Sequence, residues 1–361
     1  MAAGAGSLQV TLTWQSGRIV TVDSQLQRPL AAINQLLQRH GPEQACQILP
    51  LLFAVCGEAH SLAGRLASGV LNPSRDSLHS SLRGVLLENI REYLLRWKQH
   101  WYLPFNQAEF QQQLKAVNQA IRQQDEWAIA LAAENLQTWL QQAGGLSRWQ
   151  RHFRLQLERE LGPTSRLQLP PQTRDWQQFE PAVAAGQQGY SGAGASALLE
   201  VGNKTLIERL SGMLEQQWQG LQHCLQALVQ GSIAVADWLA CRAEGNGSDE
   251  QREGWVKTSR GWLLHRLAAP VDGSLVDGSV ADGHLDWQIY APTDVNFCGP
   301  LLACLLTGIE ASEAQARILA QRLMLALDPC VEGQIELINL SNDTSGSAVT
   351  ATGLRGEHPD A

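Results

Sequence analysis

The residues in this chain best suited to metal chemistry are two cysteines that lie near its opposite ends. Cys56 is followed by a glycine and, four positions later, by His60, in a stretch with helical character. Residues four apart on a helix share one face, so the thiol and the imidazole are within reach of one metal ion or of each other. Cys330 follows Asp328-Pro329, a pair that ends a helix because the residue before proline avoids the helical region. Each pattern alone fits a buried thiol in a core equally well.

Thiolates are soft metal ligands, and a neighbouring imidazole can donate a hydrogen bond to a bound sulfur. Cys56, His60 and Cys330 with one open position would also suit a catalytic zinc ion, although the sequence shows no positioned general base. The other five cysteines are interpreted as core or incidental residues; they are Cys46, Cys224, Cys241, Cys298 and Cys304.

The stretches around both cysteines resemble the two signatures of nickel–iron hydrogenase large subunits, which read R-x-C-G-x-C-x-x-x-H and D-P-C-x-x-C-x-x-H. In those enzymes two cysteine pairs hold a nickel ion and an Fe(CN)2(CO) unit. Here each pair keeps one cysteine. Phe53 stands at the first thiolate position, Gly333 at the last, and Glu336 replaces the final histidine. A site with four thiolates cannot be built from these residues.

Two further segments resemble the same enzymes. Ser259–His265 (SRGWLLH) is similar to their P-R-G-x-L-x-H strand, in which the arginine lies close to the diatomic ligands of the iron. Ala291–Phe297 is similar to a P-S/T-x-W-N segment, with Val295 in place of tryptophan. On its own, Arg260 would be expected to form a surface ion pair. Four partial motifs in the right order make coincidence a poor explanation.

Loss of one cysteine from each pair is typical of degenerate relatives of the large subunit, and the chain resembles the hydrogenase expression/formation proteins of the HupK/HoxV type. The resemblance implies a scaffold that assembles or holds the Fe(CN)2(CO) unit before its transfer to the nickel–iron hydrogenase large subunit. It implies a HypC-type iron chaperone, working with HypD, as a partner. Cys56 and Cys330 would bind iron, and His60 and Arg260 would contact the iron unit. Neither nickel binding nor catalysis is expected.

The resemblance also implies the fold, which is α+β and mostly α. It is a helical bundle like that of the large subunit, with small peripheral β-hairpins or sheets. A single domain over residues 1–340 would bring both cysteine motifs together, and residues 341–361 would form a polar, disordered tail. Glycine at position 333 would leave room for Cys330 to shift toward the iron.

Local patterns predict several of the elements. Alternating residues in Leu8–Trp14 and Arg18–Val22 predict a β-hairpin. Residues 77–161 have a helical pattern throughout, and their tryptophans at positions 97, 101, 127, 139 and 149 are interpreted as core or helix-contact residues. Residues 162–194, rich in proline, glycine and glutamine, predict a long loop.

Further helices and strands are predicted on either side of that loop. Helix starts are indicated by a proline at position 29 and by capping patterns at Asn106, Thr205 and Ser312. Residues 244–253 are interpreted as a polar connection, and the strands that follow are predicted at Trp255–Ala269 and His284–Tyr290.

The composition excludes several classes of function. The chain has 361 residues, of which 44% are hydrophobic and 17% charged, as in soluble globular proteins. A net charge of −8 argues against nucleic-acid binding. The longest apolar runs fall far short of the roughly 20 residues that span a bilayer. Seven cysteines without framework spacing and an N-terminus without a secretory pattern favour a cytoplasmic protein.

Two alternatives to an iron scaffold stay open at this point. The metal site could be vestigial and the protein a folding chaperone for the large subunit. The chain could instead be a non-catalytic structural subunit of a respiratory-type complex. A structural subunit would dock stably to a small iron–sulfur partner, whereas a maturation factor would bind its partners transiently.

Overall fold

The computed structural model describes residues 6–340, apart from 54, 71–74, 101–105, 124, 167–204, 231–232, 234, 245–250, 269–285 and 299–300. Most of the predicted loop over 162–194 lies outside the described residues, and its first five residues form the short 3-10 helix η1, Gly162–Arg166. The predicted tail, 341–361, also lies outside them.

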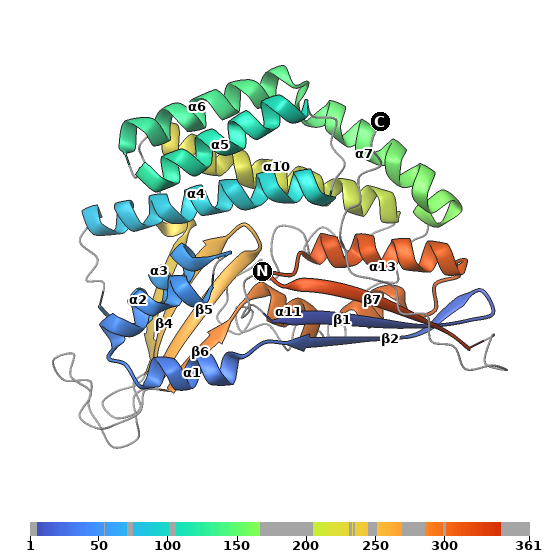
Figure 1. Ribbon diagram of the computed structural model, residues 1–361, viewed down its shortest axis with the longest axis horizontal. Helices are drawn as coiled ribbons and strands as arrows, with labels where there is room; N and C mark the ends of the chain where they lie inside the picture. Colours follow the sequence, from blue (N-terminus) through green and yellow to red (C-terminus); the bar gives the residue numbers. More distant parts are fainter. Residues whose placement is uncertain are drawn as a thin grey trace.

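Five long helices form a bundle along one side of the molecule (Figure 1). They are α4 (Arg75–His100), α5 (Gln107–Gln123), α6 (Glu126–Gln142), α7 (Gly145–Leu161) and α10 (Leu206–Gln230). Helix α10 contacts α4, α6 and α7. The helical pattern over 77–161 is therefore confirmed. The predicted caps also form, because Asn106 and Thr205 each accept a hydrogen bond from the backbone N–H of the residue three positions on.

A four-stranded antiparallel sheet lies beneath the left half of the bundle in Figure 1. Its strands, in spatial order, are β3 (Leu239–Glu244), β4 (Gln251–Thr258), β5 (Gly261–Ala268) and β6 (Asp286–Tyr290). The prediction of one strand over Trp255–Ala269 is wrong. The chain turns at Ser259-Arg260 into Gly261, whose φ of 131° favours glycine. Residues 251–253 lie in β4 and not in a connection.

The second sheet has three strands in the order β2-β1-β7. Strands β1 (Ser7–Gln15) and β2 (Arg18–Gln27) form the predicted hairpin, closed by Ser16 and Gly17, both with positive φ. Strand β7 (Glu332–Asn339) was not predicted; it pairs in parallel with β1 and places Gly333 opposite Leu8.

Three helices near the C-terminal end cover this sheet: α11 (Pro292–Cys298), α12 (Leu301–Leu306) and α13 (Glu313–Leu327). The predicted capping box at Ser312 is present. Helix α13 ends before Pro329, as predicted, and Asp328 follows it with a left-handed backbone.

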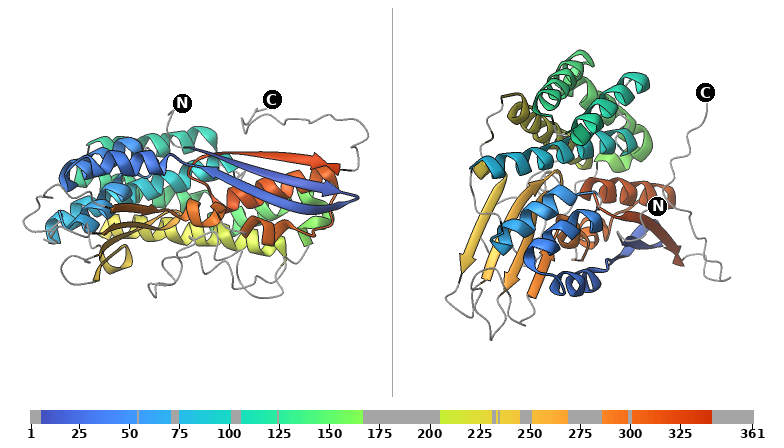
Figure 2. Two further views of the ribbon diagram at one scale, coloured as in Figure 1. Left: turned by 90° about the horizontal axis from the view of Figure 1, so that it is seen from below. Right: turned by 60° about the vertical axis from the view of Figure 1, so that its left-hand side comes forward.

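Helices α1 (Leu30–Gln38), α2 (Pro42–Leu52) and α3 (Gly57–Ser68) complete the fold. Proline 29 precedes α1 as its N-cap. Helix α3 contacts α2, α4, β4 and β5. Figure 2 shows α2 and α3 lying against the four-stranded sheet, beneath the bundle. The start of α3 is therefore held between the sheet and α4.

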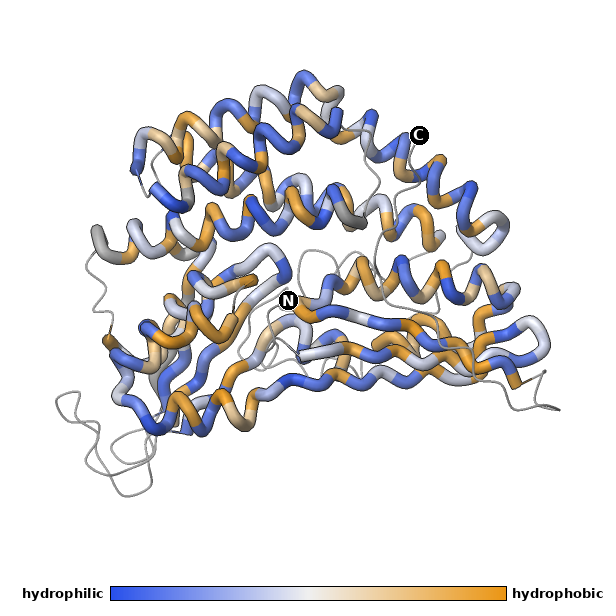
Figure 3. The backbone as a smooth tube through the Cα atoms, viewed as in Figure 1, coloured by the Kyte–Doolittle hydropathy of each residue, from blue (hydrophilic) through white to orange (hydrophobic). Residues whose placement is uncertain are grey.

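Buried apolar side chains from every layer form one continuous cluster. Along the helices, hydrophobic and hydrophilic stretches alternate (Figure 3). Trp97, Trp139 and Trp149 are buried, as expected of core or helix-contact residues, whereas Trp127 is 74% exposed and does not lie in the core. Tryptophan 101 lies outside the described residues. Within the described ranges, no helix has the length and apolar character needed to cross a membrane.

Candidate metal centre

Cys56 lies in the short connection between α2 and α3, as the N-cap of α3. Its backbone N–H donates to Phe53 O (3.2 Å), and its carbonyl oxygen accepts from the N–H of His60 (3.0 Å). The next residue has to be glycine, because a Cβ on Gly57 would come within 2.9 Å of the Cα of Pro50. The Cys-Gly pair therefore fixes how closely α2 approaches α3.

Cys330 is reached directly from the end of α13. Its backbone N–H donates to the hydroxyl of Thr293 (3.0 Å), a buried residue at the start of α11. Thr293 belongs to the segment that resembles the hydrogenase P-S/T-x-W-N motif. The segment that contains Thr293 thus fixes the position of the segment that contains Cys330.

The two cysteines share one electrostatic environment. Cys56 is partly exposed as a residue, yet burial raises the pKa of its thiol well above the usual range. Negative charge on Cys330 and on Glu88 raises that pKa further, whereas Arg260 and Arg28 oppose the shift. Cys56 is therefore a thiol in the metal-free protein. If Cys56 served as a metal ligand, it would have to lose this proton on binding, because the thiolate is the form that ligates metals.

The side chain of Arg260 is only 12% exposed, so Arg260 does not form the surface ion pair expected of an arginine on its own. Its Nε lies 2.8 Å from Asp328 Oδ2, and its Nη2 lies 3.1 Å from Glu92 Oε2. Arg96 of α4 also pairs with Asp328. Burial alone would lower the pKa of Arg260, but Asp328, Glu92 and the two cysteines together raise it. The guanidinium is therefore a fixed positive charge beside the cysteines.

Arg28 belongs to the same cluster and was missed. Its Nη1 lies 2.6 and 2.7 Å from the two carboxylate oxygens of Asp294, and its side chain is only 4% exposed. Its Cζ lies 5.7 Å from the centre of the Phe53 ring. Negative charge on Cys330, Asp294 and Cys56 raises its pKa although burial opposes this. No local sequence signal identifies Arg28, because Asp294 is 266 positions away.

His60 is fully buried and is held from two sides. Its ring stacks on Phe53 with centroids 3.6 Å apart and an interplanar angle of 5°. Its Nδ1 lies 2.8 Å from His265 Nε2, and the indole Nε1 of Trp287 donates to His265 Nδ1 (3.1 Å). Burial lowers the pKa of His265 to about 3 and that of His60 well below its usual range. Both imidazoles are therefore neutral. His265 and Trp287 had no predicted role.

Neither position that lost a thiolate is empty. Phe53 places its phenyl ring on His60. A Cβ on Gly333 would come within 2.8 Å of the Met324 sulfur, so the methionine of α13 occupies the space where we expected room for Cys330 to shift. Glu336 accepts a hydrogen bond from Gln9 in the neighbouring strand. Among the described residues, no group of three or more His, Cys, Asp and Glu could hold a metal ion.

One cavity, of about 370 Å³, adjoins Cys330. It is lined by Cys330, Arg260, Asp328 and Met324 and, on the Cys56 side, by Val55. The Arg91 guanidinium donates to Val55 O (3.1 Å) and so holds this segment against α4.

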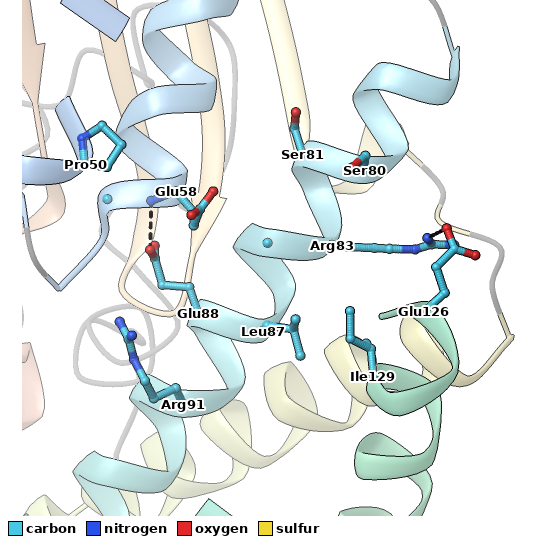
Figure 4. Close-up of a pocket in the computed structure, with 12 residues that line it drawn as sticks. Pro50, Glu58, Ser80, Ser81, Arg83, Leu87, Glu88, Arg91, Glu126 and Ile129 are labelled. Atoms are coloured by element: carbon cyan, nitrogen blue, oxygen red, sulfur yellow. Dashed lines mark hydrogen bonds and ion pairs between the residues drawn. The ribbon is translucent and has the colours of Figure 1, made fainter. Parts of the chain in front are cut away.

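A second cavity, of about 410 Å³, is lined by Gly57, the residue after Cys56, and by residues of α4. Figure 4 shows Glu88 of α4 pointing at the first turn of α3, and Arg83 paired with Glu126 across the cavity. Glu88 accepts hydrogen bonds from the backbone N–H groups of Glu58 (2.9 Å) and Ala59 (3.4 Å). Burial raises its pKa to about 8.

No protein-family model matches the chain. A variant of the NiFeSe hydrogenase of Desulfovibrio vulgaris Hildenborough superimposes with a TM-score of 0.53 at 12% identity, covering 87% of this chain and 93% of that one. The same enzyme in its reduced state gives a TM-score of 0.52 at 12% identity, covering 87% and 94%. The fold is thus that of nickel–iron hydrogenase large subunits, mostly helical α+β as predicted. At this identity the likeness concerns the fold alone.

The sequence relatives are closer. The chain is 32% identical, over 381 residues, to the hydrogenase expression/formation protein HupK of Azotobacter vinelandii. It is also 32% identical, over 380 residues, to the hydrogenase expression/formation protein HupV of Azotobacter chroococcum mcd 1. Both alignments cover 93% of this chain and 99% of the relative. The chain belongs to the hydrogenase expression/formation proteins, which confirms the family predicted from the cysteine motifs. Its role is in hydrogenase maturation.

Proposed function

We propose that this protein is a non-catalytic carrier, which holds the Fe(CN)2(CO) unit during maturation and passes it to the nickel–iron hydrogenase large subunit. The observation that carries the proposal is the shared environment of Cys56 and Cys330. Negative charge on Cys330 raises the pKa of Cys56. Negative charge on either cysteine also raises the pKa of Arg28 and of Arg260. Two thiols that could serve as soft ligands thus belong to one charged cluster, and one of them, Cys330, lines a cavity, which supports the proposal.

The residues that replace the missing thiolates support a carrier. Phe53 is apolar and already stacked on His60, and Gly333 has no side chain. Iron held by two protein thiolates keeps open coordination positions, through which it can be taken up and passed on. Four thiolates would hold it permanently, and without them the nickel side of the site is incomplete.

The charges of the site also favour release. Arg28, Arg91, Arg96 and Arg260 are paired with Asp294, Asp328 and Glu92, four positive charges with three negative ones. Iron(II) with two cyanides is neutral, so two bound thiolates would add two negative charges, of which these ion pairs balance only one. Charge in a buried site is costly without a partner. The protein would therefore hold the loaded unit less tightly than a compensated site.

The partner proposed for uptake is a HypC-type chaperone acting with HypD. A terminal cysteine of the chaperone would supply a missing thiolate to the iron, so that the unit moves between proteins by ligand replacement. The two cavities are lined by Gly57 and by Val55, the sequence neighbours of Cys56, and would provide space for an incoming residue.

Infrared spectroscopy of anaerobically purified protein tests the proposal in the carbonyl and cyanide stretching region. One carbonyl and two cyanide bands should appear, with iron but without stoichiometric nickel, and the sample should neither take up nor evolve hydrogen. Protein that lacks these bands after coexpression with the maturation proteins would favour the folding-chaperone alternative. Nickel near one equivalent in untagged protein would refute the carrier.

A further inference from the structure

Three buried side chains form a hydrogen-bonded series that ends at His60, one helical turn after Cys56. An indole Nε1–H is always a donor, so Trp287 requires Nδ1 of His265 to be an acceptor (3.1 Å). Neutral His265 then carries its proton on Nε2 and donates it to His60 Nδ1 (2.8 Å). Neutral His60 must in turn carry its proton on Nε2. The series therefore determines the tautomer of both imidazoles from the indole onward.

The last donor of the series is the Nε2–H of His60, and it has no acceptor among the described residues. This nitrogen is buried. An unsatisfied buried donor costs about 1–3 kcal/mol, and such groups are rare in folded proteins. Stacking on Phe53 fixes the plane of the ring, and the hydrogen bond to His265 fixes the direction of its two nitrogens. The arrangement therefore keeps one N–H donor in a fixed direction without using it.

Gly64 shows that the surrounding fold accommodates this series. A Cβ at position 64 of α3 would come within 3.0 Å of the Trp287 ring and 3.4 Å of His265 Nδ1. A larger residue would therefore push apart the indole and the imidazole that it contacts. Helix α3 thus approaches β5 and β6 at the place where the hydrogen bonds form.

We propose that Trp287 and His265 are positioning residues that lock His60 in its Nε2–H tautomer, which makes it a preset donor for an anionic acceptor at the metal centre. The acceptor would be a sulfur or a cyanide nitrogen, either the Cys56 thiolate formed on metal binding or a cyanide of the iron unit. The identity of the acceptor rests on the proposed function, whereas the tautomer does not. Loading would satisfy a donor for which the metal-free protein has no partner.

The tautomer is tested by nitrogen NMR of full-length, metal-free protein labelled with 15N-histidine. The His60 signals, assigned with His60→Gln, should show a protonated Nε2 and an unprotonated Nδ1. Trp287→Phe removes the donor that starts the series, so both tautomers of His60 should then be populated. Trp255→Phe is the matched control, since Trp255 is buried in the same sheet but donates to Glu253. A protonated Nδ1 on His60 in the unmodified protein would overturn the proposal even if Trp287→Phe did not fold.

The acceptor is tested by infrared spectroscopy of loaded protein at equal iron content. In Trp287→Phe, a shift of one cyanide band would identify a cyanide nitrogen as the acceptor, and a joint shift of all three bands would identify the Cys56 sulfur. Trp255→Phe should leave the bands in place. Bands unmoved in Trp287→Phe, although its tautomers are mixed, would contradict the role given to His60. Absence of bands from the unmodified protein would refute the carrier function instead.

Discussion

Cys56 and Cys330 hold unequal positions in the centre. Cys56 is the N-cap of α3, whose dipole favours a negative charge at that end. His60 is held one turn along the same helix by the rings of Phe53 and His265. Cys330 is anchored through its backbone N–H and lines the open cavity. We therefore infer that Cys56 is the principal iron ligand.

Substitution of each ligand should reveal this inequality. Cys56→Ser should abolish the carbonyl and cyanide bands, because it removes the thiolate next to His60. Cys330→Ser should weaken them less, and His60→Ala should change their frequencies or yield without eliminating them. Hydrogenase maturation in a complementation assay should follow the same order. Equal loss in both cysteine variants would indicate a symmetric two-thiolate clamp, and no loss in either would make the cysteines relics.

Glu88 should make stability depend on pH in the direction opposite to most carboxylates. Its pKa rises from 4.5 to about 8 on folding, so between these values the folded state binds more protons than the unfolded state. The free energy of unfolding should therefore fall as pH rises through this window, by about 1 kcal/mol per pH unit relative to Glu88→Gln. Urea denaturation at pH 5, 6, 7 and 8 measures this difference.

The control for Glu88 is Glu134→Gln, at an exposed position on α6. This variant should keep the slope of the unmodified protein. If the free energy of unfolding of Glu88→Gln depended on pH as it does in the unmodified protein, the Glu88 carboxyl would be ionised at neutral pH despite its burial. Its negative charge would then oppose proton release from Cys56 at neutral pH.

At the scale of elements, the contact between α13 and β7 determines whether a second cysteine could return. Strand β7 places Gly333 beside β1, and Met324 of α13 lies over it. Both residues are buried. The lost thiolate position is therefore filled by Met324. Substitutions of Gly333 and of Met324 should accordingly be energetically coupled.

Gly333→Cys should destabilise the protein by about 1–3 kcal/mol, because the new side chain collides with Met324. Met324→Ala alone should cost about 2–5 kcal/mol through the cavity it leaves. The double variant should be more stable than the sum predicts, by about 0.5–3 kcal/mol. Urea denaturation measures all three. Leu319→Ala, elsewhere in the buried face of α13, should instead add to Gly333→Cys without coupling.

Elements whose signals are local were predicted well, and those that depend on distant partners were not. The hairpin closed by Ser16-Gly17 and the capping box at Ser312 each lie within a few residues. The turn at Ser259-Arg260 was missed because apolar residues continue on both sides of it. Strand β7 was missed because its parallel partner β1 lies more than 300 positions earlier in the chain. The sequence next to β7 therefore contains no hairpin turn that would identify it as a strand.

At the scale of the whole molecule, the centre joins segments from both ends and the middle of the chain. The cysteine motifs and Arg260 could be found from family resemblance, although the resemblance does not establish what they bind. Arg28 could not be found, since its ion pair with Asp294 exists only in the folded chain. The same holds for the contact of Met324 with Gly333. These contacts, which exist only in the folded chain, determine the charge and the space around the two thiols.

The partner prediction belongs to this scale, because it requires the complete centre. A HypC-type chaperone should co-purify with the unmodified protein in a transient complex, bridged by iron that both proteins ligate. Cys56→Ala removes one side of that bridge and should weaken co-purification, together with the iron content of the complex. Cys304→Ala is the matched control, a partly buried cysteine of α12 outside the cluster, and it should change neither. If Cys56→Ala kept both partner and iron, Cys56 would not be a ligand, and the complex would have to form through protein surfaces alone.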